Sequence, residues 1–405
     1  MKYILIFLIT FSTYVQSAFA DTINRYVSEQ KVISFLPLEN LRDILGSLNS
    51  RSYTKDHFGF KYLDQDFLAE TTLDIKLQTY LDDLLSDALG AQTAIVCINP
   101  VSGKVLALAG FDKKGGDHVW SQKLVPAASL FKIVTAAGAL ELYNLSPHSL
   151  FYYNGGKHTL YRYQLKDRIT KSTHKVTLKE AFAYSINPVF GKIGQKYLKK
   201  DGLMLMAKRF LWQSYIPFEL PVAESVIEVG DKKFNLAEVA SGFNKKTKLT
   251  ALHAALIAAG VINGGVIMTP YFIEAILNTY NNQLVYESKI YPLKRCINPK
   301  TATFLKELMI ATVEIGTAKK AFNNFKKDKI LKELIIGGKT GTMDNEDHTI
   351  RYDLFSGFAC NKDLTKCIAL GIFVAHEGIL GTRAAEYARF VIKKYFEANN
   401  EFNSY

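Results

Sequence analysis

The sequence contains few cysteines and histidines, and none of them stands at the spacing of a metal site. Four cysteines and eight histidines are scattered over 405 residues, which excludes the common zinc-binding modules. The chain also has no G-x-x-x-x-G-K-[ST] sequence and no internal repeat, so a nucleotide-binding P-loop and a solenoid are excluded. We therefore expect a protein that works without a metal ion or another cofactor.

Long apolar segments are absent beyond the N-terminus. Residues 1–20, MKYILIFLITFSTYVQSAFA, contain one lysine, then an apolar stretch, and end in Ala18-Phe19-Ala20, as a cleaved secretory signal does. The apolar stretch is shorter than the ~20 residues that span a bilayer. We expect an exported protein in the periplasm or another extracytoplasmic compartment. The alternative is an uncleaved segment that anchors the protein to the inner membrane.

The chain also lacks the acidic residues that would balance its basic ones. It has 50 Lys and Arg against 38 Asp and Glu, a net charge of +12. The lysines form scattered pairs without aromatic or glycine-rich sequence between them, which indicates a solvated basic surface. Attraction to an anionic polymer or membrane face is the functional alternative. Because we expect export, nucleic acid is not an expected partner.

Two of the cysteines flank a short turn. Cys360 and Cys367 enclose the sequence NKDLTK between two apolar runs, and an exported hairpin of this layout can carry a cross-strand disulfide. Cys97 lies in an apolar strand pattern, which indicates a buried thiol, and Cys296 is the other cysteine that we expect to be free.

The order of apolar patterns predicts an α+β fold. An antiparallel sheet takes its first two strands from residues 91–110 and its others from 335–376, with helices on its faces and a mostly helical subdomain at 124–330. The expected helices are 72–89, 124–141 with Pro126 in its first turn, 178–186, 249–262 and 382–398. The expected strands after the hairpin are 335–342, 354–360 and 367–376.

A serine and a lysine share one face of the helix predicted at 124–141. Ser129 and Lys132 are three residues apart and therefore neighbours, and the apolar residues around the lysine favour its neutral, basic form. Together they make an activated serine nucleophile. The alternative is an ordinary helix with a solvated lysine. S-x-x-K also occurs at Ser28, Ser52 and Ser172, but only Ser129 opens an apolar helix.

Two further polar groups stand at the end of a predicted helix. Ser185 and Asn187, in AFAYSINPVFG, precede Pro188 at a helix-to-loop corner. A hydroxyl there can relay a proton, and an amide can bind a peptide group of a substrate. Helix capping is the alternative interpretation.

The sequence Gly338-Lys339-Thr340-Gly341-Thr342 lies on a predicted strand. The glycines allow a substrate backbone to approach, and the lysine supplies a fixed positive charge. An exposed N–H of such a strand can bind an oxyanion. We expect Lys339 to take part in catalysis and Thr340, Gly341 and Thr342 to bind substrate.

In this order, the three motifs are the signature of serine enzymes that react with penicillin. The chain resembles the transpeptidase domain of penicillin-binding proteins, class B most, from about Thr72 to the C-terminal helix. The segments that carry the resemblance are TLDIKLQ, AIVCINPVSGKVLALAG, PAASLFKI, SINPVFGKIG, LTALHAALIAAGVINGGV, VEIGTAKKA and GGKTGT. The long gap before Lys339 is similar to that of the transpeptidases and longer than in β-lactamases.

The resemblance implies a role for each motif. Ser129 would attack the D-Ala-D-Ala amide with Lys132 as its base. Ser185 would pass a proton to the leaving D-alanine, and Asn187 would hold the donor peptide. Lys339 would attract the terminal carboxylate and support the proton relay.

The resemblance also implies that the hydroxyl of Thr340 or Thr342 aids in holding that carboxylate. The amides of Ser129 and Thr342 would form the oxyanion hole. One residue departs from the family pattern, because Ala128 stands before the nucleophile where the family usually has glycine.

On this basis we expect an exported D,D-transpeptidase that cross-links peptidoglycan stem peptides and binds β-lactams covalently. A D,D-carboxypeptidase or a β-lactamase would use the same acyl-serine, and a non-catalytic β-lactam sensor would form it without turnover. The expected division is a signal at 1–20, a short N-terminal region at 21–71 and the transpeptidase domain at 72–400. Other proteins of cell-wall synthesis are the expected partners.

Overall fold

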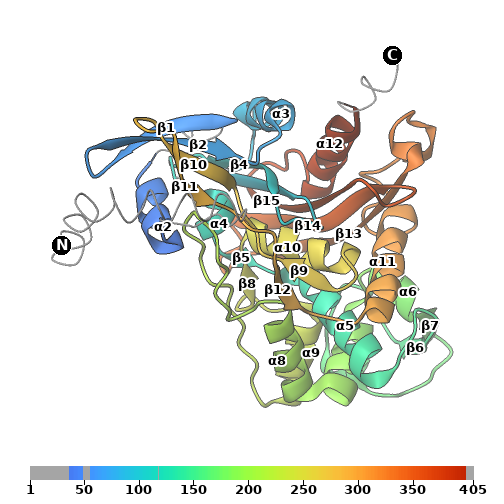
Figure 1. Cartoon of the computed structure of the whole chain (residues 1–405). Coiled ribbons are helices and arrows are strands. Elements are labelled where there is room, and N and C mark those ends of the chain that lie inside the picture. The colour runs from blue at the N-terminus through green and yellow to red at the C-terminus, as the bar shows by residue number, and fades with distance from the viewer. Residues whose placement is uncertain (1–35, 49–54, 117, 398–405) are drawn as a thin grey trace.

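The computed structural model describes residues 36–48, 55–116 and 118–397. Its centre is a five-stranded antiparallel sheet in the order β13-β14-β15-β3-β4, and helices cover both faces (Figure 1). The strands are β3 (Gln92–Ile98), β4 (Val105–Asp112), β13 (Leu334–Asp344), β14 (Ile350–Asn361) and β15 (Cys367–Glu377). The predicted sheet, with strands from the two ends of the fold, is confirmed. The predicted signal lies outside the described residues.

The central strands are buried on both faces because their sequences are continuous apolar runs. In β3, Ala94 and Val96 belong to the core on one face, whereas Ile95 and Cys97 belong to the core on the other. Such two-sided burial explains why the strand reads as QTAIVCI without alternating polar residues.

The helices on one face are α3 (Ile75–Ser86) and α12 (Ala384–Glu397), and α10 (Ala251–Ile262) covers the other. Gly371 of β15 allows α10 to lie close to the sheet, since a Cβ at this position would be 2.0 Å from the carbonyl oxygen of Ala251. Thr250 caps α10 by accepting a hydrogen bond from the N–H of His253.

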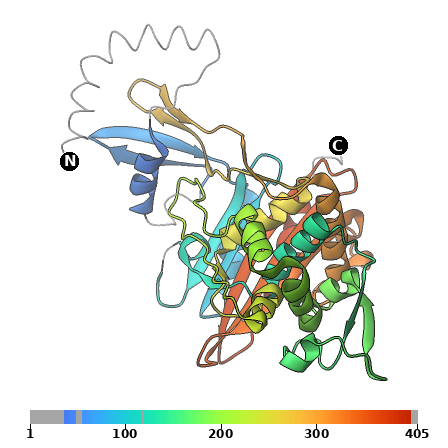
Figure 2. The same ribbon diagram turned by 90° about the horizontal axis from the view of Figure 1, so that it is seen from below.

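A helical layer beside α10 contains α5 (Phe131–Tyr143) and most of the segment between the sheet's two halves (Figure 2). The other helices between the sheet's two halves are α4 (Val119–Gln122), α6 (Leu178–Ala183), α7 (Asn187–Ile193), α8 (Lys199–Arg209), α9 (Lys233–Ser241) and α11 (Pro299–Glu314), with short helical turns at Ala128–Leu130, Arg162–Leu165 and Gly194–Leu198. Two more short turns, Phe325–Lys327 and Leu331–Glu333, lie on the face of the sheet that α12 covers. Two-stranded ribbons pair β5 (Val125–Pro126) with β8 (Lys248–Leu249), β6 (Leu150–Tyr153) with β7 (His174–Thr177), and β9 (Val266–Met268) with β12 (Pro292–Arg295).

A second sheet joins the N-terminal region to the middle of the chain. Strands β1 (His57–Tyr62) and β2 (Gln65–Thr71) pair with β10 (Ile273–Asn278) and β11 (Gln283–Glu287), and α2 (Leu38–Gly46) lies beside them (Figure 1). Phe58, Phe60 and Phe67 turn into the main core. The segment 124–330 is therefore less helical than the sequence indicated. The domain boundaries remain a prediction.

Glu219 ties this second sheet to the main body. The side chain is 1% exposed, and its carboxylate accepts hydrogen bonds from the N–H groups of Phe272 and Ile273 and from the Tyr286 hydroxyl. Burial raises the pKa of this carboxyl to about 7, since these donors offset only part of the desolvation.

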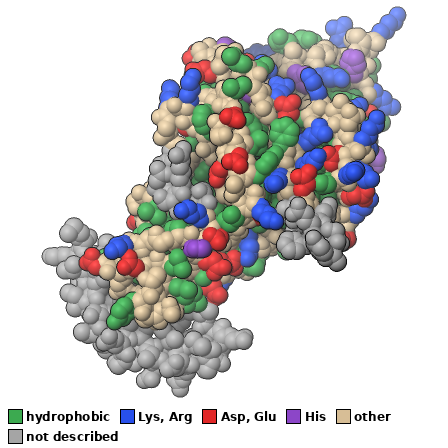
Figure 3. All heavy atoms as spheres, turned by 90° about the horizontal axis from the view of Figure 1, so that it is seen from above, with side chains coloured by type: hydrophobic (Ala, Val, Ile, Leu, Met, Phe, Trp, Pro, Cys, Tyr) green, Lys and Arg blue, Asp and Glu red, His purple; other side chains and the backbone are tan. Residues whose placement is uncertain are grey.

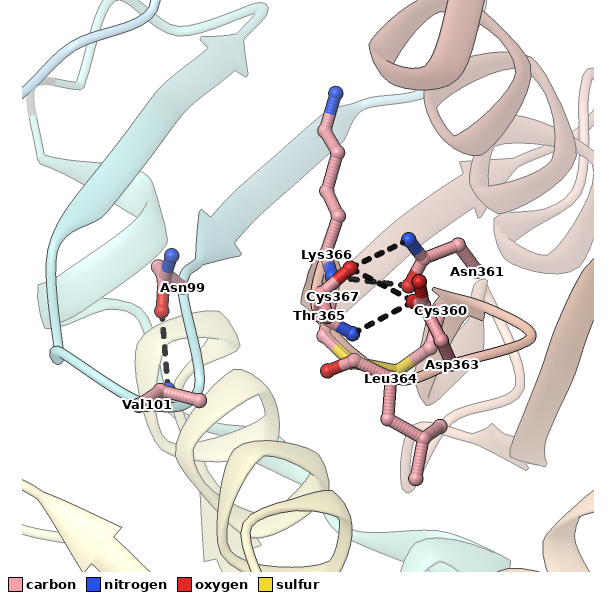
Figure 4. Close-up of a disulfide and its surroundings, with 9 residues drawn as sticks. All are labelled: Asn99, Val101, Cys360, Asn361, Asp363, Leu364, Thr365, Lys366 and Cys367. Atoms are coloured by element: carbon pink, nitrogen blue, oxygen red, sulfur yellow. Dashed lines mark hydrogen bonds between the residues drawn. A yellow bond between two sulfur atoms is a disulfide. The ribbon is translucent and has the colours of Figure 1, made fainter.

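A disulfide links β14 and β15 at the turn of their hairpin. Cys360 and Cys367 are directly opposite each other in the strand register and are bonded, as the sequence indicated (Figure 4). The turn between them is held by its own hydrogen bonds, among them Lys366 N–H to Asn361 Oδ1 at 2.9 Å and Thr365 N–H to Asp363 Oδ1 at 3.0 Å. Cys97 and Cys296 are free and buried.

The surface agrees with the interpretation of the charge as solvated. On the face seen in Figure 3, lysine and arginine side chains lie dispersed among acidic ones. Within the described part of the chain, no helix is both long and apolar enough to cross a bilayer.

Candidate active site

Ser129 lies on a short helical turn between a strand and a helix. Val125 and Pro126 pair with β8, residues Ala128–Leu130 form the turn, and α5 begins at Phe131. The prediction that Pro126 occupies the first turn of the helix is therefore wrong, because the pairing with β8 draws it into a strand. The backbone of Ala128 is left-handed, with φ 45°. A residue with a Cβ is strained in this conformation, and glycine is not.

Lys132 is fully buried directly beside Ser129. Its Nζ lies 2.8 Å from Ser129 Oγ, 2.7 Å from Asn187 Oδ1 and 2.5 Å from the carbonyl oxygen of Ser241. Burial lowers the pKa of Lys132 well below its usual value, and the charge of Lys339 lowers it further.

In its neutral, basic form Lys132 can keep these contacts. A neutral amine has two N–H groups and one lone pair. Asn187 Oδ1 and the Ser241 carbonyl are acceptors only, so they take the two N–H groups. The lone pair is left facing the Ser129 hydroxyl, where it can receive the proton. This is the geometry of an activated serine nucleophile.

Ser185 and Asn187 stand between two helices rather than at the end of one. Helix α6 ends at Ala183, Ser185 takes a left-handed backbone with φ 56°, and Asn187 begins α7 with Pro188 in its first turn. The sequence predicted that the helix ends at Pro188, but proline is accommodated in the first turn of the next one. The side chain of Asn187 contacts Lys132, and the side chain of Ser185 contacts Lys339.

The orientation of the Asn187 amide is determined by its partners. Its Nδ2 donates to the carbonyl oxygen of His158 at 2.7 Å, while its Oδ1 faces Lys132. The backbone N–H of Asn187 donates to the carbonyl oxygen of Lys157, also at 2.7 Å. The segment that carries Lys157 and His158 therefore positions Asn187.

Lys339 enters the pocket from β13, which is an edge strand of the main sheet. Its buried Nζ donates to Ser185 Oγ and to the carbonyl oxygen of Thr340, each at 3.0 Å. Burial lowers the pKa of Lys339 to about 7. Gly341 lies against the nucleophile turn, since a Cβ on it would be 3.4 Å from the Ala127 carbonyl oxygen.

Thr340 and Thr342 complete the strand at the pocket. The Thr340 hydroxyl is bonded to the hydroxyl of Thr317, which follows α11, and Thr342 is exposed. The structure thus brings together all three predicted motifs. Lys132 is hydrogen-bonded to Ser129 and Asn187, Lys339 is hydrogen-bonded to Ser185, and the charge of Lys339 acts on Lys132.

Sequence reasoning missed two contributors to the site. One is Ser241, whose carbonyl binds Lys132, followed by Gly242, whose left-handed backbone approaches the Ala128 carbonyl so closely that a Cβ would be 1.8 Å from it. The other is the carbonyl pair of Lys157 and His158. For Ser241 and Gly242, the Ser-Gly dipeptide at the end of an apolar helix was a detectable signal in the sequence. For the carbonyl groups of Lys157 and His158 the sequence contains no signal.

The other S-x-x-K sequences and His253 are not part of this site. Ser172 and Lys175 are exposed on the loop and strand that lead to α6. His253 is a core residue, as its sequence context indicated, and its ring nitrogens are bonded to Ser225 Oγ and the Phe210 carbonyl oxygen. Ser28 and Ser52 are outside the described residues.

Comparison with known proteins identifies the family of the chain. The family described as penicillin-binding protein transpeptidase domain matches residues 93–373. The chain belongs to this family. The matched segment includes every predicted site residue from Ser129 to Thr342.

Curated relatives are similar over part of their length. The chain is 27% identical over 284 residues to the peptidoglycan D,D-transpeptidase PbpA of Mycobacterium tuberculosis, covering 62% of this chain and 55% of the relative. It is 29% identical over 175 residues to PbpA of Mycolicibacterium smegmatis, covering 42% of this chain and 32% of the relative. The chain thus spans about half the length or less of the curated relatives it matches.

Solved structures share the fold. The D,D-transpeptidase domain of a peptidoglycan glycosyltransferase from Eggerthella lenta has a TM-score of 0.67 at 23% identity, covering 82% of this chain and 84% of that one. PBPA from Mycobacterium tuberculosis has a TM-score of 0.65 at 23% identity, covering 82% and 80%. The α+β fold class predicted from the sequence is confirmed.

Proposed function

We propose that this protein is an exported D,D-transpeptidase that cross-links peptidoglycan stem peptides through an acyl-serine and is acylated by β-lactams. The observation that carries the proposal is the buried Lys132, whose Nζ lies 2.8 Å from Ser129 Oγ. Family membership and the name of the PbpA relatives support the same activity.

In the acylation step, Ser129 Oγ attacks the carbonyl carbon of the D-Ala-D-Ala amide while Lys132 takes its proton. The oxyanion is held by the N–H groups of Ser129 and Thr342. The C–N bond then breaks, and the proton that Lys132 took from Ser129 passes through Ser185 to the leaving D-alanine nitrogen, so that Lys132 is neutral again. Lys339 supports this relay by its hydrogen bond to Ser185 Oγ.

In the second step, the amine of another stem peptide attacks the acyl-serine ester. It loses a proton to Lys132, the ester C–O bond breaks, and Ser129 recovers its hydroxyl. Asn187 holds the donor peptide, and Lys339 with Thr340 and Thr342 attracts its terminal carboxylate. The loop that follows β13 is held against the segment after Ser241, because Lys245 donates to the Asn345 carbonyl oxygen at 2.7 Å.

The proposed export rests on the N-terminal signal pattern and on the disulfide between Cys360 and Cys367, which forms in oxidising compartments.

The test is mass spectrometry of the purified protein with a synthetic pentapeptide ending in D-Ala-D-Ala and a D-amino acid as acceptor. A transpeptidase forms the acyl-enzyme and exchanges the terminal D-alanine for the acceptor. Hydrolysis without exchange would assign a D,D-carboxypeptidase instead. If neither the peptide nor penicillin forms an acyl-enzyme, the proposal is overturned. The variant Ser129→Ala, which lacks the proposed nucleophile, is the negative control.

A further inference from the structure

Residues 150–177 form an arm that extends from the helical layer beside the active site. Strands β6 and β7 pair along its base, and the loop between them includes the helical turn Arg162–Leu165 (Figure 2). The arm has six basic residues and one acidic residue: Lys157, Arg162, Lys166, Arg168, Lys171, Lys175 and Asp167. All seven are exposed. The arm therefore carries a net charge of +5, part of the net +12 of the whole chain.

The arm presents two tyrosine rings side by side. Tyr161 and Tyr163 are 55% and 56% exposed, and their rings are stacked with centroids 5.9 Å apart and planes 11° apart. These two stacked and half-exposed rings form an exposed aromatic pair, which we call the platform. Large exposed aromatic side chains in a cluster mark a binding surface rather than a random exposure.

This platform is held in place from beneath. Leu160 and Leu165 are buried against Ala237 of α9. Gln164, which is fully buried between the two leucines, donates to the carbonyl oxygens of Asn154 and Gly156. The backbone that carries the tyrosines is thus anchored, and binding would cost little ordering entropy.

The same loop is connected to the active site. Its carbonyl groups at Lys157 and His158 bind Asn187. Tyr163 is five positions beyond His158, so the platform lies within about 18 Å of it along an extended chain. An extended pentapeptide spans the same distance of about 18 Å.

We propose that the arm binds the polymeric substrate: the sugar rings of a peptidoglycan strand pack on Tyr161 and Tyr163, and the basic side chains attract the carboxylates of neighbouring stem peptides. A pyranose ring has an apolar face of C–H groups that fits a tyrosine ring. Stem peptides are anionic, which complements the arm's charge. The inference rests on the proposed function, since it concerns how that active site receives its polymer.

The test compares wild type with the variant Tyr161→Ala/Tyr163→Ala, both as the full chain. Binding to soluble uncross-linked peptidoglycan strands is measured together with acylation by fluorescent penicillin and turnover of the free pentapeptide. We expect the affinity for strands to fall about tenfold, as for loss of ~1.4 kcal/mol of binding free energy. Penicillin acylation and pentapeptide turnover should not change, which also shows that the variant folds.

The matched control is Tyr280→Ala, because Tyr280 is 97% exposed on the turn between β10 and β11. It should leave strand binding unchanged. A second variant, Arg168→Ser/Lys171→Ser, should reduce the affinity for strands and flatten its dependence on salt.

Unchanged strand binding in both arm variants would overturn the inference. The inference would also be overturned if wild type bound vesicles of anionic lipid as tightly as it binds strands and Tyr161→Ala/Tyr163→Ala lost this vesicle binding. That result would assign the arm to a membrane. If wild type binds strands through the tyrosines but shows neither penicillin acylation nor pentapeptide turnover, the proposed function fails and the binding site stands.

Discussion

Lys132 Nζ and Asn187 Oδ1 lie 2.7 Å apart, although 55 positions separate them in the sequence. The amide oxygen takes one N–H of the buried amine, and the carbonyl of Ser241 takes the other. This relationship determines where the lone pair points. We therefore expect Asn187 to position the proposed base as well as to hold the donor peptide.

Replacing Lys132 with alanine should slow acylation by penicillin at least about 10³-fold, since general-base catalysis contributes factors of this order. In wild type the acylation rate should rise with pH as Lys132 loses its proton, and burial moves this rise well below the usual lysine range. Stopped-flow acylation between pH 5 and 9 measures both effects. Lys175→Ala, in the exposed S-x-x-K at Ser172, is the control; a rate within tenfold of wild type for Lys132→Ala would reject the base.

Much of the active site was predictable because its side chains belong to short motifs with distinct chemistry. Ser129, Lys132, Ser185, Asn187 and Lys339 each stood in a recognisable local pattern, and the pocket joins them. What the sequence did not reveal are main-chain contacts, such as the Ser241 carbonyl on Lys132. Every residue has a backbone carbonyl, so a hydrogen bond to one does not require a particular residue type and cannot be read from the sequence.

The fold was predictable where apolar runs were long and not where pairing was non-local. Strands β3, β13, β14 and β15 are buried runs, which the sequence indicates directly. By contrast, β10 pairs with β2, some two hundred residues earlier, and short strands of this kind have weak local signals. Pro126 was misplaced for the same reason, since its pairing with Lys248 overrides the local preference.

Ala128→Gly should stabilise the protein by up to about 1 kcal/mol. Relief of the left-handed strain, roughly 1–2 kcal/mol, exceeds the entropic cost of glycine of about 0.5–1 kcal/mol. Urea unfolding monitored by circular dichroism measures the difference, and Ala139→Gly, within α5, should have the opposite effect. Destabilisation by Ala128→Gly would show that the strain at the nucleophile turn is not relieved in this way.

Glu219→Gln should change how stability depends on pH. The folded protein holds the proton of Glu219 up to about pH 7, whereas the unfolded chain releases it near 4.5. The folded state therefore binds more protons between these values, and the wild type loses stability as the pH rises through this window. Glutamine does not titrate, so the variant should gain relative stability from pH 5 to pH 8, by at most about 3 kcal/mol.

The measurement is urea unfolding of both proteins across this pH range, with Glu70→Gln as the control because Glu70 is exposed. A difference between Glu219→Gln and wild type that stays constant with pH would contradict the raised pKa.

The disulfide predicts a thiol count. Denatured protein without reductant should expose two reactive thiols, from Cys97 and Cys296, and four after reduction. Cys360→Ser/Cys367→Ser should lower the free energy of unfolding by about 2 kcal/mol, as expected for so short a loop. Four thiols before reduction, in protein recovered from an oxidising compartment, would exclude the bridge.

The most direct test of the central claim is to locate the penicillin adduct by mass spectrometry of proteolytic peptides. We predict one adduct per chain, on Ser129 in the peptide that contains LVPAASLFK, and none in Ser129→Ala. An adduct on any other serine, or undiminished acylation of Ser129→Ala, would contradict the assignment of the nucleophile and with it the function proposed for the pocket.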